Sequence, residues 1–234
     1  MMIRLLTLLA LLPLTLQAED LGELIFEDSF ERVESDDAKE EIGNGWGTNS
    51  AKRAKGDKQV DLDDGTMRIF ISERADHAVS VTHPLGIQNG SVQLKFKLEN
   101  PKDSIKLNFA DLTYKGVHAG HLFAVTINAD SVMIQDLKTG NMKKEIREAK
   151  LAKTLTKEVK DMLKTKQKSF PKKTAIGEWH TVRIDVNGEH LSVLLNGDKA
   201  GEFTSEGIAH PLKGTLRLGV AKEAVVDDVK MWKK

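Results

Sequence analysis

The sequence predicts an all-β protein, a sandwich of two antiparallel sheets with one inserted amphipathic helix. Three observations lead to this prediction: short runs of alternating apolar and polar residues, Asx-Gly pairs between those runs, and a single stretch with helical periodicity. Alternation with a period of two gives each strand one apolar face, which two packed sheets bury between them. The regular strand–helix alternation of an α/β protein is missing.

Strands are predicted wherever every second residue is apolar. The clearest runs are Val92 to Leu98, Ile105 to Phe109, Phe123 to Ile127, Val182 to Val186, Leu191 to Leu195 and Leu216 to Val220. Tight hairpin turns are expected at Asp64-Gly65, Asn89-Gly90, Asn187-Gly188 and Asn196-Gly197, because Asx-Gly pairs tolerate a positive φ angle. Ten or more strands are expected in all, about twice the usual number for one sheet.

One segment follows a different period. Between about 141 and 170, apolar residues such as Met142, Ile146, Val159 and Met162 recur at spacings of three and four, with Lys and Glu between them. This spacing predicts one amphipathic helix of about six turns. It should begin near Asn141 and end before Pro171, and its apolar stripe should pack on the sandwich.

The first eighteen residues have the pattern of a secretory signal peptide. Arg4 precedes an apolar run at 5–16, and small Ala18 marks a cleavage point. A run of about twelve apolar residues is too short to span a bilayer. We therefore expect residues 1–18 to be removed and residues 19–234 to form one exported domain without a membrane span. The periplasm, the envelope and the medium all remain open as destinations.

The charges divide into two opposite segments, and the chain has no cysteine. Residues 19–41 carry eleven acids and two bases, while residues 141–173 carry twelve bases and four acids. The basic helix would suit an anionic polymer such as a sulfated or uronic glycan, or it is a solvated face that offsets the acidic segment. Nucleic acid is not expected as a partner, because no aromatic residues interleave the lysines.

Three motifs together resemble those of concanavalin A-like jelly-roll proteins. They are the opening Phe26-Glu27-Asp28-Ser29-Phe30, the segment Gly177 to Ile184 followed by Val193 to Gly197, and the ending Val226 to Trp232. All three resemble motifs of the glucanases of this superfamily, and the hairpin and the ending also resemble those of laminin G-like modules and 3-keto-disaccharide hydrolases. The resemblance spans the chain and implies a jelly roll in which the opening and closing motifs lie side by side.

The resemblance also implies a calcium site and argues against one activity. Relatives bind Ca²⁺ through an Asp matching Asp227, with groups near the opening motif, so Glu27, Asp28 and a carbonyl at Gly65 are the remaining candidates. Otherwise these carboxylates would be satisfied by backbone N–H groups. Laminarinases carry an E-x-D-x-E strand whose alternate carboxylates cleave the glycosidic bond, and this chain has no such strand. A laminarinase-type activity is therefore not expected.

Histidines give a second candidate site. His118 and His121 lie near Tyr114, and Arg74, Asp76 and His77 precede another strand. Residues three apart on a strand point to opposite faces, so His118 and His121 converge only if Gly120 bends the chain. With His77 they would hold a transition metal or act as acid and base; the alternative is a set of ordinary turn histidines.

Three functions remain open from the sequence, the third being a cell-envelope structural protein whose helix docks a partner. The first is a non-catalytic exported sandwich that binds carbohydrate or an anionic envelope surface, with Ca²⁺ as a structural ion. The second is a glycan or 3-keto-glycoside hydrolase with a histidine-containing site, as the resemblance implies. The sequence fixes neither the ligand nor the oligomeric state.

Overall fold

The computed structural model describes residues 20–234, so the predicted signal peptide at 1–18 lies outside the described residues. The first nine strands are β1 (Glu23–Asp28), β2 (Gly47–Thr48), β3 (Val60–Asp63), β4 (Thr66–Phe70), β5 (Val81–Ile87), β6 (Gly90–Lys97), β7 (Ser104–Ala110), β8 (His121–Asn128) and β9 (Ser131–Asp136). The rest are β10 (Gln167–Pro171), β11 (His180–Asn187), β12 (His190–Leu195), β13 (Asp198–Thr204), β14 (Lys213–Val220) and β15 (Glu223–Lys233). Helices are short: α1 (Ser50–Arg53), the 3₁₀ turn η1 (His118–Gly120), α2 (Lys144–Leu151) and α3 (Lys157–Thr165).

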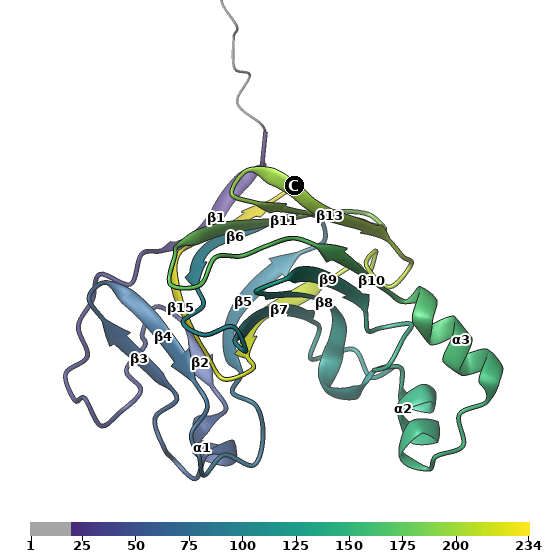
Figure 1. Cartoon of the computed structure of the whole chain (residues 1–234), viewed down its shortest axis with the longest axis horizontal. Helices are drawn as coiled ribbons and strands as arrows, with labels where there is room; N and C mark the ends of the chain where they lie inside the picture. The colour runs from purple at the N-terminus through teal and green to yellow at the C-terminus, as the bar shows by residue number, and fades with distance from the viewer. Residues whose placement is uncertain (1–19) are drawn as a thin grey trace, which may run out of the picture.

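The strands form two antiparallel sheets, which confirms the predicted jelly-roll sandwich. One sheet has the order β13-β12-β11-β6-β15-β4-β3, with β1 added beside β15. The other has the order β10-β9-β8-β7-β14-β5-β2. Both sheets curve in the same sense, so the second sheet presents a concave face on the inside of an arch (Figure 1). We call this the concave face.

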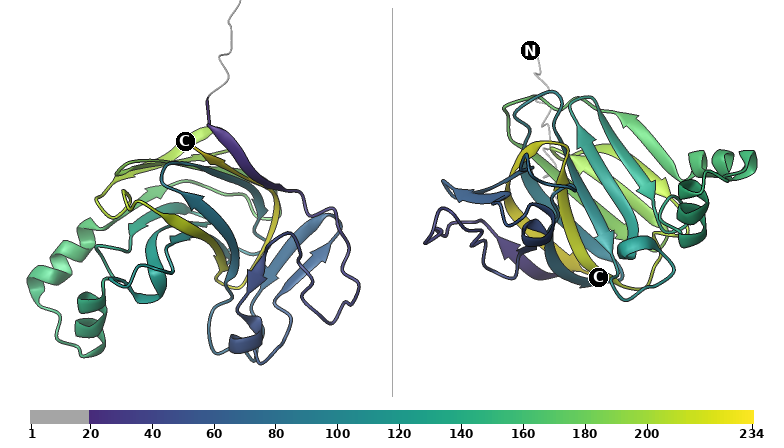
Figure 2. Two further views of the ribbon diagram at one scale, coloured as in Figure 1. Left: turned by 180° about the vertical axis from the view of Figure 1, so that it is seen from behind. Right: turned by 90° about the horizontal axis from the view of Figure 1, so that it is seen from below.

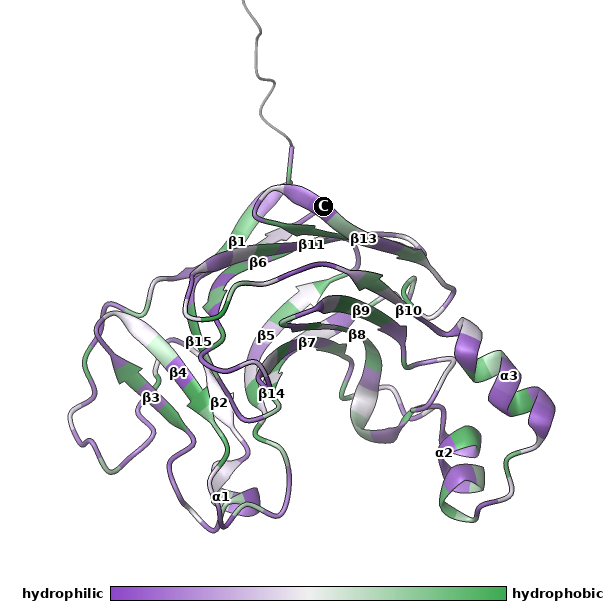
Figure 3. Cartoon of the chain, viewed as in Figure 1, coloured by the Kyte–Doolittle hydropathy of each residue, from purple (hydrophilic) through white to green (hydrophobic). Residues whose placement is uncertain are grey.

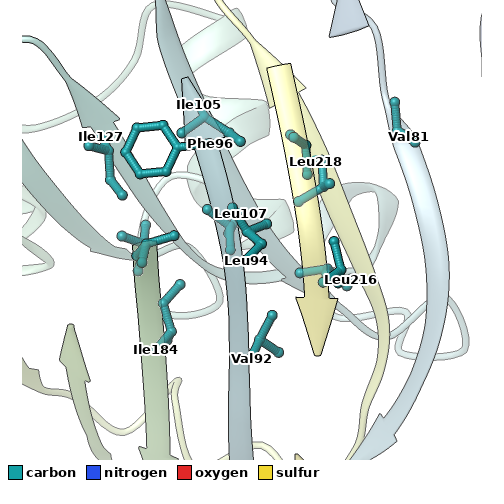
Figure 4. Packing of buried hydrophobic residues seen from close by; sticks show 14 of the residues in the cluster. Val81, Val92, Leu94, Phe96, Ile105, Leu107, Ile127, Ile184, Leu216 and Leu218 are labelled. Carbon is teal, nitrogen blue, oxygen red and sulfur yellow. The ribbon is translucent and has the colours of Figure 1, made fainter. Parts of the chain in front are cut away.

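The core lies between the sheets and follows the predicted alternation. Val92, Leu94 and Phe96 of β6 face Ile105 and Leu107 of β7 across the sandwich (Figure 4). All five side chains are fully buried. The intervening residues of each strand must therefore point away from the core, outward from one sheet or into the concave face of the other.

The turns and the closure of the sandwich also agree with the sequence prediction. Asp64 and Gly65 both have positive φ angles in the β3–β4 hairpin, as do Asn196 and Gly197 between β12 and β13. The opening strand β1 pairs with the closing strand β15, with Asp28 opposite Val229. The first and last motifs of the sandwich are thus neighbours, as the resemblance implied.

The prediction of one long helix is wrong in detail. The segment instead forms α2, α3 and the edge strand β10, which pairs with β9. Helix α2 ends where Lys153 takes a positive φ of 58° and the N–H of Thr154 donates to the carbonyl of Ala149. That is a Schellman ending, usually made by glycine. A new helix then begins at Thr156, whose hydroxyl accepts from the N–H of Val159.

The two helices do not pack into the core as expected. Ile146 is the one buried residue of α2, and α3 has none. Leu151 is 67% exposed. The helices stand at one flank of the concave face, while α1, β3 and β4 stand at the other (Figures 1 and 2). Figure 3 shows apolar and polar residues alternating around α3. Because none of its residues is buried, its apolar side is only partly covered.

One buried carboxylate ties the opening motif to the loop that follows it. Asp28 receives both terminal nitrogens of the Arg32 guanidinium, at 2.7 and 2.9 Å. It also accepts from Trp46 Nε1 at 2.9 Å and from the N–H of Phe30 at 2.9 Å. Both oxygens are therefore engaged, and the ring of Trp46 is held against Phe26 and Phe30.

We predict that Asp28→Asn destabilises the fold, because the amide cannot accept from Arg32 and Trp46 as the carboxylate does. The loss in the free energy of unfolding should be about 1–3 kcal/mol. The exposed neighbour Glu27 serves as a control, and Glu27→Gln should change stability by less than about 0.5 kcal/mol. Urea denaturation measures both; equal midpoints for the two variants would contradict this account of Asp28.

Candidate functional site on the concave face

The concave face gathers polar side chains from the middle strands of its sheet. On β7, Ile105 and Leu107 enter the core, so Lys106 and Asn108 point the other way. On β14, Leu216 and Leu218 enter the core, and Arg217 lies between them. Arg217 is paired in register with Asn108, which brings the two side chains to the same place on the sheet.

A hydrogen-bond network joins Asn108, His121 and Arg217. Asn108 donates through Nδ2 to the carbonyl of Phe123 at 3.1 Å, so its Oδ1 is the atom that accepts from His121 Nδ1 at 2.8 Å. This assigns the proton of the neutral imidazole to Nδ1. Arg217 Nη1 lies 3.3 and 3.4 Å from the two ring nitrogens of His121. The network fixes the imidazole and the guanidinium relative to each other.

The electrostatics of this face are strongly positive. Burial lowers the pKa of Lys106 and of Arg217, and the causes of these shifts include no acidic neighbour. Among residues 20–234, no carboxylate forms an ion pair with either cation. Burial, followed by the charges of Arg217 and Lys106, lowers the pKa of His121 to about 3. His121 is therefore neutral at ordinary pH, while two partly buried cations remain beside it.

Carboxylates are almost absent from this sheet. Asp136 is the one acidic residue in its seven strands. Its oxygens accept from Thr139, from Ser205 and from the N–H of Gly207, so it ties two loops together at the end of β9. The sheet thus offers cations and a neutral imidazole where a retaining glycosidase needs two carboxylates.

The turn η1 brings a second histidine beside the first. Ala119 and Gly120 have positive φ angles of 50° and 72°, and Arg217 Nη2 donates to the carbonyl of Ala119 at 2.8 Å. A Cβ on Gly120 would lie 2.3 Å from the carbonyl oxygen of Asp111, so only glycine fits there. Through this bend the rings of His118 and His121 have centroids 6.4 Å apart.

His118 differs from His121 in exposure. It lies at the surface, and desolvation together with the charges of Arg147, His77 and Arg217 lowers its pKa. The charge of His77 acts on both His118 and His121. His77 therefore lies within electrostatic reach of His118 and His121, although it comes from a loop far away in the sequence.

The other predicted ligand residues lie at the edges of this environment. Arg74 forms an ion pair with Asp57, and Asp76 lies 3.5 Å from Arg53. Both pairs belong to the loops on the flank of the concave face that carries α1. Tyr114 packs its ring against His210, with centroids 4.8 Å apart, on the opposite flank. Within residues 20–234, no hydrogen bond, ion pair or ring contact joins Arg74, Asp76 or Tyr114 to His118 or His121.

The contacts of the predicted calcium residues do not fit an ion held by that set. Asp28 has both oxygens engaged by Arg32 and Trp46, as described above. Asp227 accepts from the N–H of Asp228, and burial raises its pKa. The carboxylate of Glu31 covers Gly65. Within residues 20–234 no group of three or more His, Asp or Glu side chains is arranged to hold a metal ion. Calcium binding stays a prediction, and the reaction proposed for the concave face does not use it.

Sequence reasoning missed Lys106, Asn108 and Arg217. Each occupies an outward position in an alternating strand, so the pattern places it on the face away from the core. The pattern does not say which sheet is concave or which outward residues are neighbours across strands. Only the register of β7 with β14 and β8 unites the three.

We predict that His121→Asn reduces the dependence of stability on pH. Because the folded protein holds the pKa of His121 near 3, the unfolded chain takes up a proton between about pH 6.5 and pH 3 that the folded chain does not. Wild-type stability should therefore fall as the pH falls through this window. In the variant, the slope of the free energy of unfolding against pH should be smaller by up to about 1.4 kcal/mol per pH unit, which is the contribution of one proton. Urea denaturation between pH 7 and pH 4 checks this; parallel curves for the two proteins would contradict it.

Solved structures with the same fold include two laminarinases and a β-glucanase. The laminarinase from Rhodothermus marinus has a TM-score of 0.60 at 12% identity, over 90% of this chain and 97% of that chain. The laminarinase catalytic domain from Thermotoga maritima has a TM-score of 0.58 at 12% identity, over 91% and 98%. The Bacillus licheniformis β-glucanase has a TM-score of 0.58 at 12% identity, over 91% and 99%. Identities this low show the fold alone.

A search of curated proteins found no match by sequence. None of the helices in residues 20–234 has the length and apolar character needed to cross a bilayer. The family comparison is more specific, because residues 37–230 match the 3-keto-alpha-glucoside-1,2-lyase-like domain. The match covers most of the sandwich and includes Lys106, Asn108, His121 and Arg217 of the concave face. With its glycoside-hydrolase-like, carbohydrate-active fold, this chain belongs to the 3-keto-alpha-glucoside-1,2-lyase-like domain family.

Proposed function

We propose that the concave face cleaves 3-keto-glycosides by elimination across C1 and C2 of the keto sugar. The observation that carries the proposal is the pair of partly buried cations, Lys106 and Arg217, to which no carboxylate of the described residues 20–234 is paired. An elimination next to a ketone builds negative charge on the ketone oxygen, and preorganised cations stabilise such charge. A carboxylate pair, as in laminarinases, would serve a different transition state.

The reaction needs one base, and His118 suits that role. Its lowered pKa keeps the imidazole neutral near pH 7, and it lies at the surface, where a sugar can reach it. His118 removes the proton from C2, which is acidic because it adjoins the C3 carbonyl. The electron pair passes first to the C3 oxygen and then forms the C1–C2 double bond as the C1–O bond breaks. The departing oxygen takes the proton back from His118.

Arg217, Lys106 and His121 support that step. Arg217 and Lys106 face the developing charge on the C3 oxygen. His121 is a positioning residue: it stays neutral, and Asn108 fixes its tautomer and hence its contact with the guanidinium of Arg217. The neutral state of His121 adds no further positive charge that would repel Arg217.

We predict that His118→Ala lowers kcat on an α-linked 3-keto-disaccharide by about 10²- to 10⁴-fold. Arg217→Met should lower kcat by about 10²- to 10³-fold, because one oxyanion donor is lost. His190, an exposed histidine of β12 on the other sheet, provides the control, and His190→Ala should retain wild-type kcat. Released products are followed by mass spectrometry. A wild type without product, or a His118→Ala variant with unchanged kcat, would overturn the proposal.

A second candidate is carbohydrate binding without turnover at the same face. The same uncompensated cations favour it, since they would hold an anionic sugar as well as an anionic transition state. Saturable binding of a glycan that depends on Arg217, with no product from any 3-keto substrate, would favour this function over the elimination.

We also propose that the protein is exported, which rests on the signal-like pattern of residues 1–18. The expected mature chain begins at Glu19. The mass of the protein recovered from its native host decides this: a chain that keeps Met1 would contradict export by cleavage.

A further inference from the structure

A second recess lies beside the concave face and takes no part in the proposed elimination. It is a groove of about 400 Å³ between the loop that precedes His118 and the two helices. Its volume is within the range of about 300–1,000 Å³ typical of small-molecule sites. It is lined by Tyr114, Gly116, Lys138, Thr139, Lys143, Glu145, Ile146, Met162, Lys166 and Glu206. We call it the helix groove.

The helix groove is continuous with the position of His118. Val117 forms a bridge with Lys143, and the N–H of His118 donates to the carbonyl of Met142 at 2.8 Å. Val117 has extended dihedral angles and is buried, so Gly116 and His118 face the opposite side, about 7 Å apart. A sugar held in the groove would therefore adjoin a sugar whose C2 proton faces His118.

The groove has the surfaces that a sugar ring needs. Tyr114 is the only tyrosine of the chain, and its ring contacts the ring of His210, with centroids 4.8 Å apart. A Cβ at Gly116 would lie 2.4 Å from the Tyr114 hydroxyl, so the glycine permits this placement of the ring. Met162 of α3 is half-buried and adds apolar surface, whereas Ile146 of α2 is buried.

The charges of the groove favour an acidic ligand. Three lysines and two glutamates line it. Lys143 pairs with Glu145 at 3.0 Å and Lys166 with Glu206 at 3.5 Å, so the one net positive charge lies on Lys138. Lys138 lies with its ammonium 5.5 Å from the Tyr114 ring centre, and none of the acidic groups in residues 20–234 forms an ion pair with it. Glu145 and Glu206 are 78% and 67% exposed, so both carboxylates extend toward solvent. The side chain of Lys166 is only 19% exposed. The cations therefore lie deeper than the carboxylates.

We propose that the helix groove is a subsite for a uronic acid unit, placed next to the reacting 3-keto sugar. Tyr114 packs on the ring of the uronic acid and Lys138 binds its carboxylate, while Lys143 exchanges its exposed partner Glu145 for the same carboxylate. The subsite deepens the proposed function and rests on it for the position of the reacting sugar. It makes acidic disaccharides, rather than neutral ones, the preferred substrate class.

The first test measures binding without turnover. Isothermal titration calorimetry compares the full protein with 4-O-α-glucosyl-glucuronic acid and with maltose, which has a hydroxymethyl group in place of the carboxylate. We expect the acidic disaccharide to bind about tenfold more tightly, as a charge-assisted hydrogen bond would give. The preference should shrink as NaCl rises from about 0.05 M to about 0.5 M. Equal affinities for the two sugars would overturn the subsite.

Matched variants locate the effect. Lys138→Ala with Lys143→Ala should reduce the preference to less than about twofold. Tyr114→Leu should weaken both sugars equally, because it removes the ring platform and no charge. Lys95→Ala with Lys199→Ala is the control, since both lysines lie on the other sheet, and it should keep the preference. Unchanged thermal unfolding of each variant shows that the fold is intact; a preference that persists in Lys138→Ala/Lys143→Ala would contradict the assignment.

A kinetic arm separates this proposal from the proposed function. The 3-keto forms of the two disaccharides are compared by kcat/KM, and the acidic one should be favoured by the same factor. If neither is cleaved, the elimination is wrong, and the calorimetry alone then decides whether the groove binds an acidic sugar. If both are cleaved at equal kcat/KM, the elimination stands and the subsite is wrong.

Discussion

The buried layer between the two sheets decides which side chains can meet on the concave face. Ile105 and Leu107 on β7, and Leu216 and Leu218 on β14, are all held in that layer. A slip of one residue in either strand would turn its apolar residues outward and bury its polar ones. The register is therefore strongly determined, and with it the position of Arg217 opposite Asn108. The chemistry of the concave face depends on an apolar contact that lies on the far side of the same strands.

The same fold carries opposite charges in this chain and in glucanases that use paired carboxylates. A jelly roll offers its concave sheet as a platform and leaves the choice of side chains open. Here the platform bears Lys106, Arg217 and a neutral His121, and Asp136 is used to hold loops together. A site of this kind suits a reaction in which negative charge develops on the substrate. The likeness of the backbones is thus compatible with a different bond-breaking step.

Much of the fold follows from local patterns in the sequence, and the site follows only in part. Strand alternation and Asx-Gly turns depend only on residues close together in the sequence. The predicted strand at Val92 to Phe96 and the predicted turn at Asn196-Gly197 are therefore both present in the structure. His118 and His121 were predicted to converge on condition that Gly120 bends the chain, and it does. Lys106 and Arg217 could not be paired in advance, since they are far apart in sequence and meet only through the order of strands. The helix was predicted too long because Lys153, rather than glycine, ends α2.

Strand β10 has a consequence for the way this protein meets other copies of itself. It is the outermost strand of the concave sheet, where unpaired backbone groups invite the strand of another molecule. Its last residue, Pro171, has no N–H to offer, and the Lys168 ammonium lies 4.9 Å from the ring centre of Phe170. Proline and lysine at a sheet edge are the features that discourage edge-to-edge growth. Strand β10 therefore adds one strand to the concave sheet and at the same time disfavours edge-to-edge pairing of that sheet with another molecule.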